Sequence, residues 1–494
     1  MSLPTTVVDY IRHDDNQPSH RSSAIDLGKS LQTTFVQEVT RSEPSIGRVE
    51  ASASDEFKLP SRRSLFVVIF GNALFQVTFF IIVSSASAYA EHLGGTATFS
   101  GLTIGIPTVF SGLALLVTTR LDKGRYNGCF QFAYLCAILG NITYGLAYRA
   151  NFLYLILIGR CITGFSFICF MYHKRYCADP RIVGIRRRTT LASWLVLGQA
   201  FGFSAGPFLG GVLHKIGFGN RVFNGYTSPG WIMAGAWCLF WPLSNWLFED
   251  APPRPAPSRS TTPPPTSTPI PTTGIELPTL SQPTSRSPTP PPPPPSWRDL
   301  SWRQWGVTAC MCWFAMTCFN ILGAWESNIP VYSAIALGYS PFQAGNFIAL
   351  GGICTLPFLL LNVRYARKFQ DRTTLATGTS LGLAGLLIML ILIKTDKVSF
   401  GPFFVCWFLV ALGFNLASTC TLSLLSKQLP DEWVTGVSMA IQYSNYTGRV
   451  TGAVLGGAGV KIGMPNYLGI QIAIVGFGGV MYLVLWRDLK AKTG

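Results

Sequence analysis

Long apolar segments recur along most of this chain, and they constrain its fold more than any other feature. Each is close to the roughly 20 residues that an α-helix needs to cross a bilayer. Six lie at residues 64–89, 98–119, 129–148, 152–173, 189–213 and 229–248, and six more at 305–335, 341–362, 373–394, 400–426, 433–458 and 467–487. Segments this long and uniformly apolar indicate helices rather than barrel strands. The sequence therefore predicts an all-α membrane protein with 12 transmembrane helices in two six-helix bundles.

Composition agrees with this class and argues against soluble ones. Charged residues make up only 12% of the chain, whereas soluble domains carry about 25%. The net charge of +16 comes from Lys and Arg between apolar segments rather than from basic blocks, so we expect no nucleic-acid partner. The sequence lacks a Walker loop, catalytic-triad spacing and metal-ligand spacing, also among its 12 cysteines. We therefore expect no enzyme, no cofactor and no metal, and transport driven by a gradient.

The apolar segments and the regions between them predict five parts: a polar cytoplasmic tail (1–60), a first bundle (61–250), a linker (251–300), a second bundle (301–488) and a short tail (489–494). The linker holds 18 of the chain's 33 prolines, so we expect it to be extended and disordered. It is either a plain spacer or a docking site for an SH3-like partner. We expect the bundles to form a monomer.

Lys and Arg gather in alternate loops, around residues 120–125, 174–188, 364–372 and 427. By the positive-inside rule this side is cytoplasmic, and an even number of helices places both termini and the linker there too.

An internal repeat relates the two predicted bundles. The stretch GPFLGGVLHKIG (206–217) matches GAVLGGAGVKIG (452–463) at a constant offset of 246 residues. Both stretches end the fifth helix of their bundle, which is typical of a transporter built from two parallel halves. Generic glycine-rich helix packing is the alternative. We expect conformational roles for these residues: Gly206, Pro207, Gly210, Gly211, Gly456 and Gly457.

Charges inside predicted spans are candidate functional groups because a bilayer makes them costly. Glu326, Arg160 and Arg449 lie well inside, and Lys174 and Arg175 lie near one end of the fourth span. Arginines can hold an oxyanion with paired hydrogen bonds. Glu326 either pairs with an arginine when the anion is absent or carries a proton.

Each candidate also has a structural interpretation. The Glu326 charge can lock two helices, Arg160 can hold backbone carbonyls, and Lys174 and Arg175 can snorkel to the surface. Asn72 and Gln76 share one helix face, and either line the substrate path or bond to a neighbouring helix.

Three motifs resemble signatures of the major facilitator superfamily: RLDKGRYNG (120–128), RCITG (160–164) and GFSAGPFLGG (202–211). The resemblance implies two six-helix bundles around a central cavity that work by alternating access. It also implies gating roles for Asp122 and Arg125 in the first motif.

A narrower resemblance is to the membrane part of plant SPX-containing vacuolar phosphate transporters and their lysosomal animal relatives. It rests on residues 81–105, 140–149, 171–180, 223–231, 424–430 and 448–452. It implies that Arg160, Arg175, Glu326 and Arg449 occupy positions where that branch keeps the same residue types. The implied substrate is inorganic phosphate at a vacuolar or lysosome-like membrane, with the plasma membrane as the alternative. The first 60 residues are too short for an SPX domain, so regulation by inositol pyrophosphates is not expected.

Three hypotheses for function follow. The first is a carrier of a small anion, phosphate foremost, with or without protons. The second is a proton-coupled antiporter of small organic molecules or drugs, for which Glu326 and the Gly-Pro motif argue. The third is a non-transporting receptor or scaffold that uses the Pro-rich linker. The sensitivity of transport to charge would separate the first two, and deletion of residues 251–297 would test the third.

Overall fold

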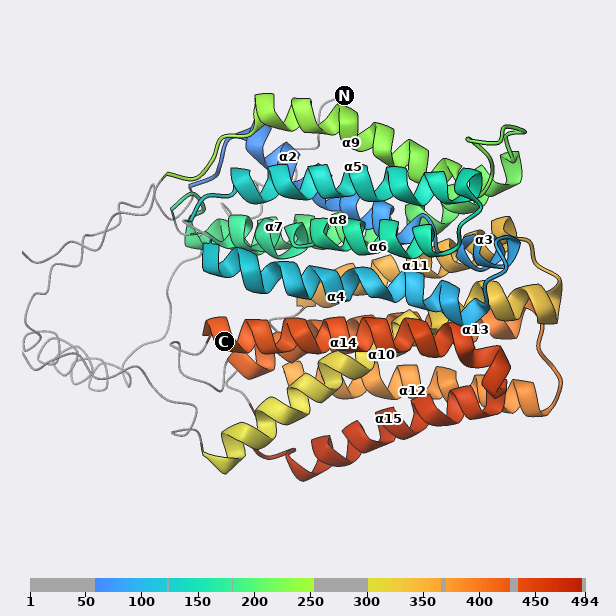
Figure 1. The fold of residues 1–494 in the computed structure, drawn as a ribbon. Helices are drawn as coiled ribbons and strands as arrows, with labels where there is room; N and C mark the ends of the chain where they lie inside the picture. The colour runs from blue at the N-terminus through green and yellow to red at the C-terminus, as the bar shows by residue number, and fades with distance from the viewer. Residues whose placement is uncertain are drawn as a thin grey trace, which may run out of the picture. The chain divides into compact units, whose positions relative to one another are not determined.

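The computed structural model describes residues 58–121, 124–179, 181–252, 301–365, 370–426 and 434–490, all within one compact unit. We call the end where α2 begins at Arg62, α9 ends at Leu247 and α10 begins at Trp302 the linker end. The opposite end, where α3 ends at His92 and α4 begins at Ala97, is the loop end. The linker end is on the left in Figure 1.

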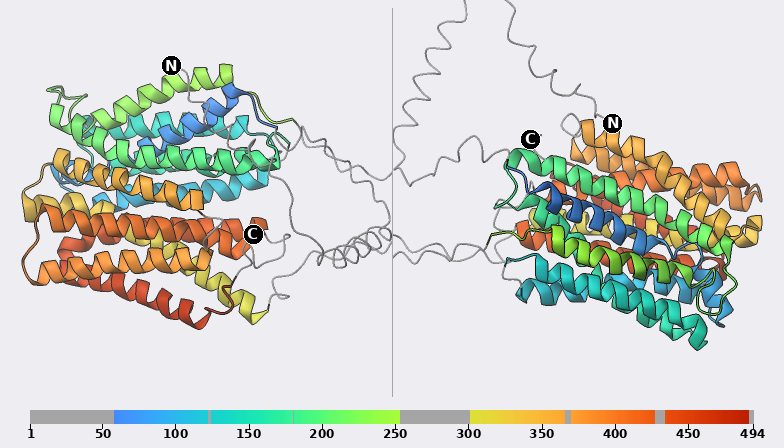
Figure 2. Two further views of the ribbon diagram at one scale, coloured as in Figure 1. Left: turned by 180° about the vertical axis from the view of Figure 1, so that it is seen from behind. Right: turned by 90° about the horizontal axis from the view of Figure 1, so that it is seen from above.

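The helices form two halves. The first contains α2 (Arg62–Phe80), α3 (Ala86–His92), α4 (Ala97–Leu121), α5 (Asn127–Ala150), α6 (Tyr154–Ser166), α7 (Cys169–Ala178), α8 (Ile185–Ile216) and α9 (Ser228–Leu247). The second contains α10 (Trp302–Leu337), α11 (Pro341–Tyr365), α12 (Asp371–Lys394), α13 (Phe400–Ser426), α14 (Val434–Ile462) and α15 (Met464–Val484). In the left view of Figure 2 the blue-to-green helices lie together, as do the yellow-to-red ones.

Every predicted span coincides with a helix or a helix pair. The difference is that two spans are broken: the first at residues 81–85, between α2 and α3, and the fourth at residues 167–168, between α6 and α7. At the first break the backbone hydrogen bonds tighten to partners three residues back, from Val83 to Phe80 and from Ser85 to Ile82. Hydropathy did not reveal either break because the segments stay apolar through it.

Ten spans among the described residues are long and apolar enough to cross a membrane, with α6 and α7 counted as one. The remaining two of the twelve positions belong to α9 and α14, whose hydropathy is lowered by four tryptophans in α9 and by many polar side chains in α14. On the outer helices, Leu239, Trp246 and Leu483 are 77%, 75% and 72% exposed. Such exposed apolar side chains are typical of a lipid-facing surface. Over the residues that the structure describes, the protein is therefore an all-helical membrane protein, with ten spans that meet the length and hydropathy of a crossing helix and with α9 and α14 in the two remaining positions.

Within each half, the repeated glycines bring two helices into close contact. In the first half, α8 packs on α2 and the residues that follow it through Gly202, Gly206 and Gly210. In the second half, α14 packs on α10 through their repeat counterparts Gly448, Gly452 and Gly456. A Cβ atom on any of these six glycines would overlap atoms of the segment packed against it. Small residues at this spacing let helix backbones approach closely in a membrane. The internal repeat is thus a repeated helix-packing surface.

The neighbouring glycines of the repeat face the other half. Gly211 lies against Phe342 on α11, and Gly457 lies against Gly101 on α4. Beyond them, α8 runs beside α11 and α14 runs beside α4 (Figure 1). The closest approaches of both pairs begin at the loop end. Between α8 and α11 they reach Gly352, near the middle of α11. Between α4 and α14 they extend further toward the linker end, to Gly112, whose carbonyl accepts from the Tyr443 hydroxyl at 3.0 Å. The halves are therefore joined toward the loop end.

We predict that Gly456→Val lowers the free energy of unfolding by about 1–3 kcal/mol, because the larger side chain must push α14 away from α10. Thermal unfolding of the purified protein in detergent measures the change. Gly469→Val on α15 is the matched control, since a Cβ there meets no atom within 4 Å. Equal losses in the two variants would contradict a packing role for Gly456.

Candidate functional site

A buried ion pair joins α14 to α10 in the second half. Arg449 donates from Nη1 to Oε1 of Glu326 at 3.1 Å and from Nη2 to Oε2, so the pair is bidentate. Arg449 is 6% exposed and Glu326 is 1% exposed. The glycine packing of α14 on α10 makes this possible, because Gly323 on α10 sits directly against the backbone and side chain of Arg449. Two charges in a low-dielectric interior require this kind of hydrogen-bonded geometry.

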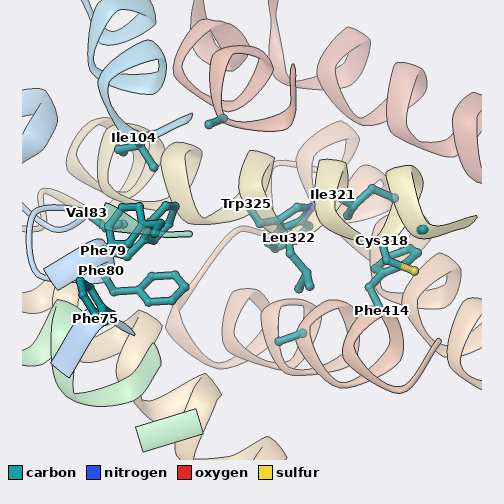
Figure 3. Packing of buried hydrophobic residues seen from close by; sticks show 14 of the residues in the cluster. Phe75, Phe79, Phe80, Val83, Ile104, Cys318, Ile321, Leu322, Trp325 and Phe414 are labelled. Atoms are coloured by element: carbon teal, nitrogen blue, oxygen red, sulfur yellow. The ribbon is translucent and has the colours of Figure 1, made fainter. Parts of the chain in front are cut away.

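Two aromatic rings of the first half cover the same arginine. The guanidinium carbon of Arg449 lies 5.0 Å from the ring centroid of Phe79 and 5.1 Å from that of Phe80. Both rings sit at the end of α2, just before its break, and cation–π contacts of this kind strengthen when water is excluded. Figure 3 shows Phe79 and Phe80 set apart from the apolar residues around Trp325 on α10. Arg449 therefore contacts both halves of the protein.

Arg160, from the first half, lies near the same Phe79 ring. It is 1% exposed and donates from Nε to the carbonyl of Thr103 at 3.1 Å and from Nη2 to the carbonyl of Phe79 at 3.5 Å. Its guanidinium carbon lies 5.7 Å from the Phe79 centroid, so both arginines flank the same ring. Among the described residues, Arg160 has no carboxylate partner. The region thus holds two arginines and one carboxylate.

The face of α14 that carries Arg449 is polar toward the linker end. Ser438, Gln442 and Asn445 precede Arg449 at spacings of 11, 7 and 4 residues, which places all four on one helix face. The opposite face of α14 lines an apolar groove that includes Val454 and Ala458. The polar face lies between the α10 and α4 contacts of this helix, so it points to the centre of the protein.

The remaining substrate candidates are dispersed. Asn72 donates to the carbonyl of Leu195 at 3.0 Å, so it bonds α2 to α8, and Gln76 packs on Gly202 of that helix. Lys174 is exposed near the end of α7. Arg175 is half-buried, with its guanidinium carbon 5.3 Å from the Tyr172 ring centroid.

The predicted gating residues lie at several separate places in the structure. Asp122 lies outside the described residues, and Arg125 is exposed. Pro207 is inside α8, and its carbonyl faces Gly345 of α11 across the halves. Gly206, Gly210, Gly211, Gly456 and Gly457 all occupy helix contacts, as described above.

A second ionic cluster, at the linker end, escaped the sequence analysis. Asp179 accepts from Arg181 Nε at 3.0 Å and from the Tyr126 hydroxyl at 2.7 Å. Arg181 also donates to the carbonyls of Gly124 and Pro252, at 2.9 and 2.8 Å. The cluster therefore ties together three segments of the first half. An Asp two residues before an Arg is a local signal for it, but nothing local indicates the carbonyl partners.

Burial on its own would raise the pKa of Asp179. The hydrogen bonds from Arg181 and Tyr126 outweigh that effect and hold the pKa of this carboxyl below its usual value of 3.8.

Sequence comparison identifies the relatives of this chain. The family model described as Major Facilitator Superfamily matches residues 66–453. An uncharacterised MFS-type transporter of Schizosaccharomyces pombe is 31% identical over 445 residues, which cover 88% of this chain and 84% of the relative. An SPX domain-containing membrane protein of Arabidopsis thaliana is 33% identical over 178 residues, or 36% of this chain and 25% of the relative. The motifs that resemble the plant proteins are spread from residue 81 to residue 452, whereas this alignment covers only 36% of the chain.

Solved structures share the fold at low sequence identity. A POT family transporter in complex with a thioalcohol-conjugated peptide superimposes with a TM-score of 0.63 at 10% identity, covering 87% of this chain and 99% of that one. A bacterial homologue of the human lysosomal transporter Spinster gives a TM-score of 0.58 at 12% identity, with coverages of 86% and 96%.

The Asp179 cluster generates a prediction about pH. We expect Asp179→Asn to lower the melting temperature at pH 7, because Arg181 loses its ionic partner. A carboxyl whose pKa is lowered by folding stabilises the protein above its unfolded pKa, and this stabilisation disappears as the pH falls through the folded pKa. The difference between the variant and the wild type should therefore shrink below about pH 3.8. Asp396→Asn, at an exposed position, is the control. A difference that does not vary with pH would refute the ionic role.

Proposed function

This chain belongs to the Major Facilitator Superfamily, and we propose that it is a secondary transporter of a small anion, inorganic phosphate foremost. Transport proceeds by alternating access across a vacuolar or other endomembrane. The linker end faces the cytoplasm, with both termini on that side, as the distribution of Lys and Arg in the loops indicates. The protein acts as a monomer.

The observation that carries this proposal is the excess of buried positive charge where the halves meet. Arg449 is neutralised by Glu326, whereas Arg160 is held by backbone carbonyls. A buried charge without a counterion is costly. A bound monoanion would supply the missing negative charge.

Glu326 gives the site a means of exchange. Its carboxylate accepts hydrogen bonds from Nη1 and Nη2 of Arg449, the same two donors that two oxygen atoms of a phosphate would use. In the proposed cycle, an arriving anion displaces Glu326 from Arg449, and a proton on Glu326 favours that displacement. A divalent phosphate with a proton on Glu326 and a monovalent phosphate with ionised Glu326 then leave the same net charge in the site.

The arrangement of the halves suggests the access route. The close contacts of α8 with α11 lie toward the loop end, and those of α4 with α14 run from the loop end to Gly112 and Tyr443. The polar face of α14 leads from the linker end up to Arg449. An anion would therefore enter from the linker end, near Lys174 and Arg175, and reach Arg449. Rocking of the two halves about the site would then open the loop end.

Phosphate is favoured over other anions by the likeness to the plant SPX domain-containing membrane proteins. A bidentate arginine also suits a tetrahedral oxyanion.

We predict that Arg449→Ala lowers saturable uptake of radiolabelled phosphate into proteoliposomes by at least about tenfold, because one charge-assisted contact contributes about 1.5–3 kcal/mol. Uptake is measured with and without a pH gradient, which shows whether protons are coupled. Arg149→Ala, at an exposed site at the end of α5, is the matched control and should transport as the wild type does.

Removal of Arg449 alone leaves Glu326 as an unpaired buried charge, so the protein could unfold for that reason. The double variant Arg449→Gln/Glu326→Gln removes both charges and should remain folded but inactive. Phosphate uptake at the wild-type rate in either folded variant would refute the proposal. The antiporter hypothesis would be favoured instead if the wild type did not take up phosphate but transported an organic molecule in response to a pH gradient, and if the variants lost that transport.

A further inference from the structure

A histidine that the proposed cycle does not use is buried in the first half. His173 on α7 is 0% exposed, and neither Nδ1 nor Nε2 has a hydrogen-bond partner among the described residues. A neutral imidazole has one N–H donor and one acceptor nitrogen, so both of its polar groups are unpaired. Buried polar groups are nearly always hydrogen-bonded, so this exception needs an explanation.

The side chains that contact His173 are apolar. The centroid of its ring lies 5.1 Å from that of Phe130 on α5 and 6.0 Å from that of Phe75 on α2. A Cβ atom on Gly71 of α2 would lie 3.6 Å from Nε2, so this nitrogen faces a glycine. The neutral ring packs well there, whereas an imidazolium would be a buried charge without an acceptor. Contacts with aromatic rings offset only part of that cost.

The ionisable groups on the surrounding helices do not favour a proton on His173. α7 packs against α2, α5 and α8. Tyr126 and Tyr134 lie four residues before and after Phe130, and tyrosines are neutral near pH 7. The charged residues on α7, at the start of α2 and at the start of α8 are all basic: Arg62, Arg63, Lys174, Arg175, Arg186, Arg187 and Arg188. Positive charges oppose the formation of an imidazolium.

The described carboxylates at this end of the first half are engaged elsewhere or exposed. Asp179, directly after α7, accepts from Arg181 and Tyr126. Asp250 accepts from backbone N–H groups at the start of α5, and Glu249 is exposed. Because its hydrogen bonds hold the pKa of Asp179 below 3.8, this anchor at the end of α7 stays intact at pH 5.5.

The break in the fourth span allows α7 to move independently of α6. At the break, backbone hydrogen bonds run to partners three residues back, from Phe167 to Gly164 and from Phe170 to Phe167. Short stretches of this kind often mark hinges. α7 also carries Lys174 and Arg175, which the proposed access route places near the anion entrance. A displacement of α7 would therefore move both entrance charges.

We propose that His173 is a proton sensor that controls the position of α7. While His173 is neutral, α7 stays packed on α2 and α5. A proton taken from water at the linker end forms a second N–H bond on the ring, and the imidazolium then requires a hydrated position. α7 is displaced between the break and Asp179, and Lys174 and Arg175 move with it. The effect on the anion entrance rests on the proposed function, whereas the response of α7 to protons does not.

Cys177 reports this displacement, because it lies one turn after His173 on α7 and is 2% exposed. The purified full-length protein in detergent is treated with N-ethylmaleimide at pH 7.5 and at pH 5.5. Peptide mass spectrometry measures the alkylation rate of each cysteine. The rate at Cys177 is divided by its rate in the denatured protein at the same pH, which removes the pH dependence of the reagent. This ratio measures how often α7 is displaced.

We expect the Cys177 ratio of the wild type to rise about tenfold between pH 7.5 and pH 5.5. The reason is that a histidine protonated only in the displaced state shifts the equilibrium by the proton affinity of imidazole, whose pKa in water is about 6.5. His173→Phe and His173→Leu place an apolar side chain among the aromatic rings and should show no such rise.

Two controls accompany these variants. His92→Phe removes an exposed histidine at the loop end, so its Cys177 ratio should respond to pH as the wild type does. Cys406 on α13 is 0% exposed and belongs to the second half, so its ratio should be the same at both pH values.

A Cys177 ratio that rises equally in the wild type and in both His173 variants would overturn the proposal. No rise in the wild type would also overturn it, and a bound water molecule would then account for the unpaired nitrogens. An equal rise at Cys406 would indicate general unfolding and would overturn it too. Absence of phosphate uptake by the wild type would refute the transport function alone, because the alkylation ratio is measured without phosphate.

Discussion

The bidentate pair between Arg449 and Glu326 depends on close helix packing, and much of the site depends on that pair in turn. An arginine can stay in the interior of a membrane protein only if its charge and its donors are satisfied. Glycines on α14 allow that helix to approach α10 closely enough for the carboxylate to reach both terminal nitrogens. Phe79 and Phe80 then cover the guanidinium from the other half. One pair therefore fixes the position of α10, α14 and the end of α2 relative to one another.

The internal repeat explains how two kinds of contact arise from one motif. At each double glycine, the first residue packs inside its own half and the second packs against the other half: Gly210 and Gly211 on α8, Gly456 and Gly457 on α14. A helix that uses adjacent residues in this way links internal packing to the contact between halves. Rocking of the halves can then rearrange the second set of contacts while the first set keeps each half rigid.

Sequence reasoning predicted the fold well, because spans of about 20 apolar residues and a long repeat are signals carried by many residues at once. It also singled out Arg160, Glu326 and Arg449 by the rarity of charge in apolar segments, and whether they bind substrate stays a prediction. Pairing of Glu326 with an arginine was one of the two alternatives left open, and the structure contains that pair. It did not anticipate Phe79 or Phe80, because an aromatic residue in an apolar helix looks the same whether it packs or contacts a charge. The sequence likewise could not decide whether Asn72 lines the substrate path or bonds to a neighbouring helix, because this depends on tertiary contacts. In the structure Asn72 donates to a carbonyl of α8.

The imbalance of two arginines and one carboxylate has an electrical consequence. The proposed site would carry one net positive charge without an anion, and a bound monoanion would bring this charge to zero. Moving one elementary charge through a potential of 100 mV changes its free energy by about 2.3 kcal/mol. A membrane potential would therefore act on the conformational return of the empty carrier and leave the loaded step nearly unaffected. In the proposed transport cycle, the single carboxylate would thus determine which half of the cycle responds to voltage.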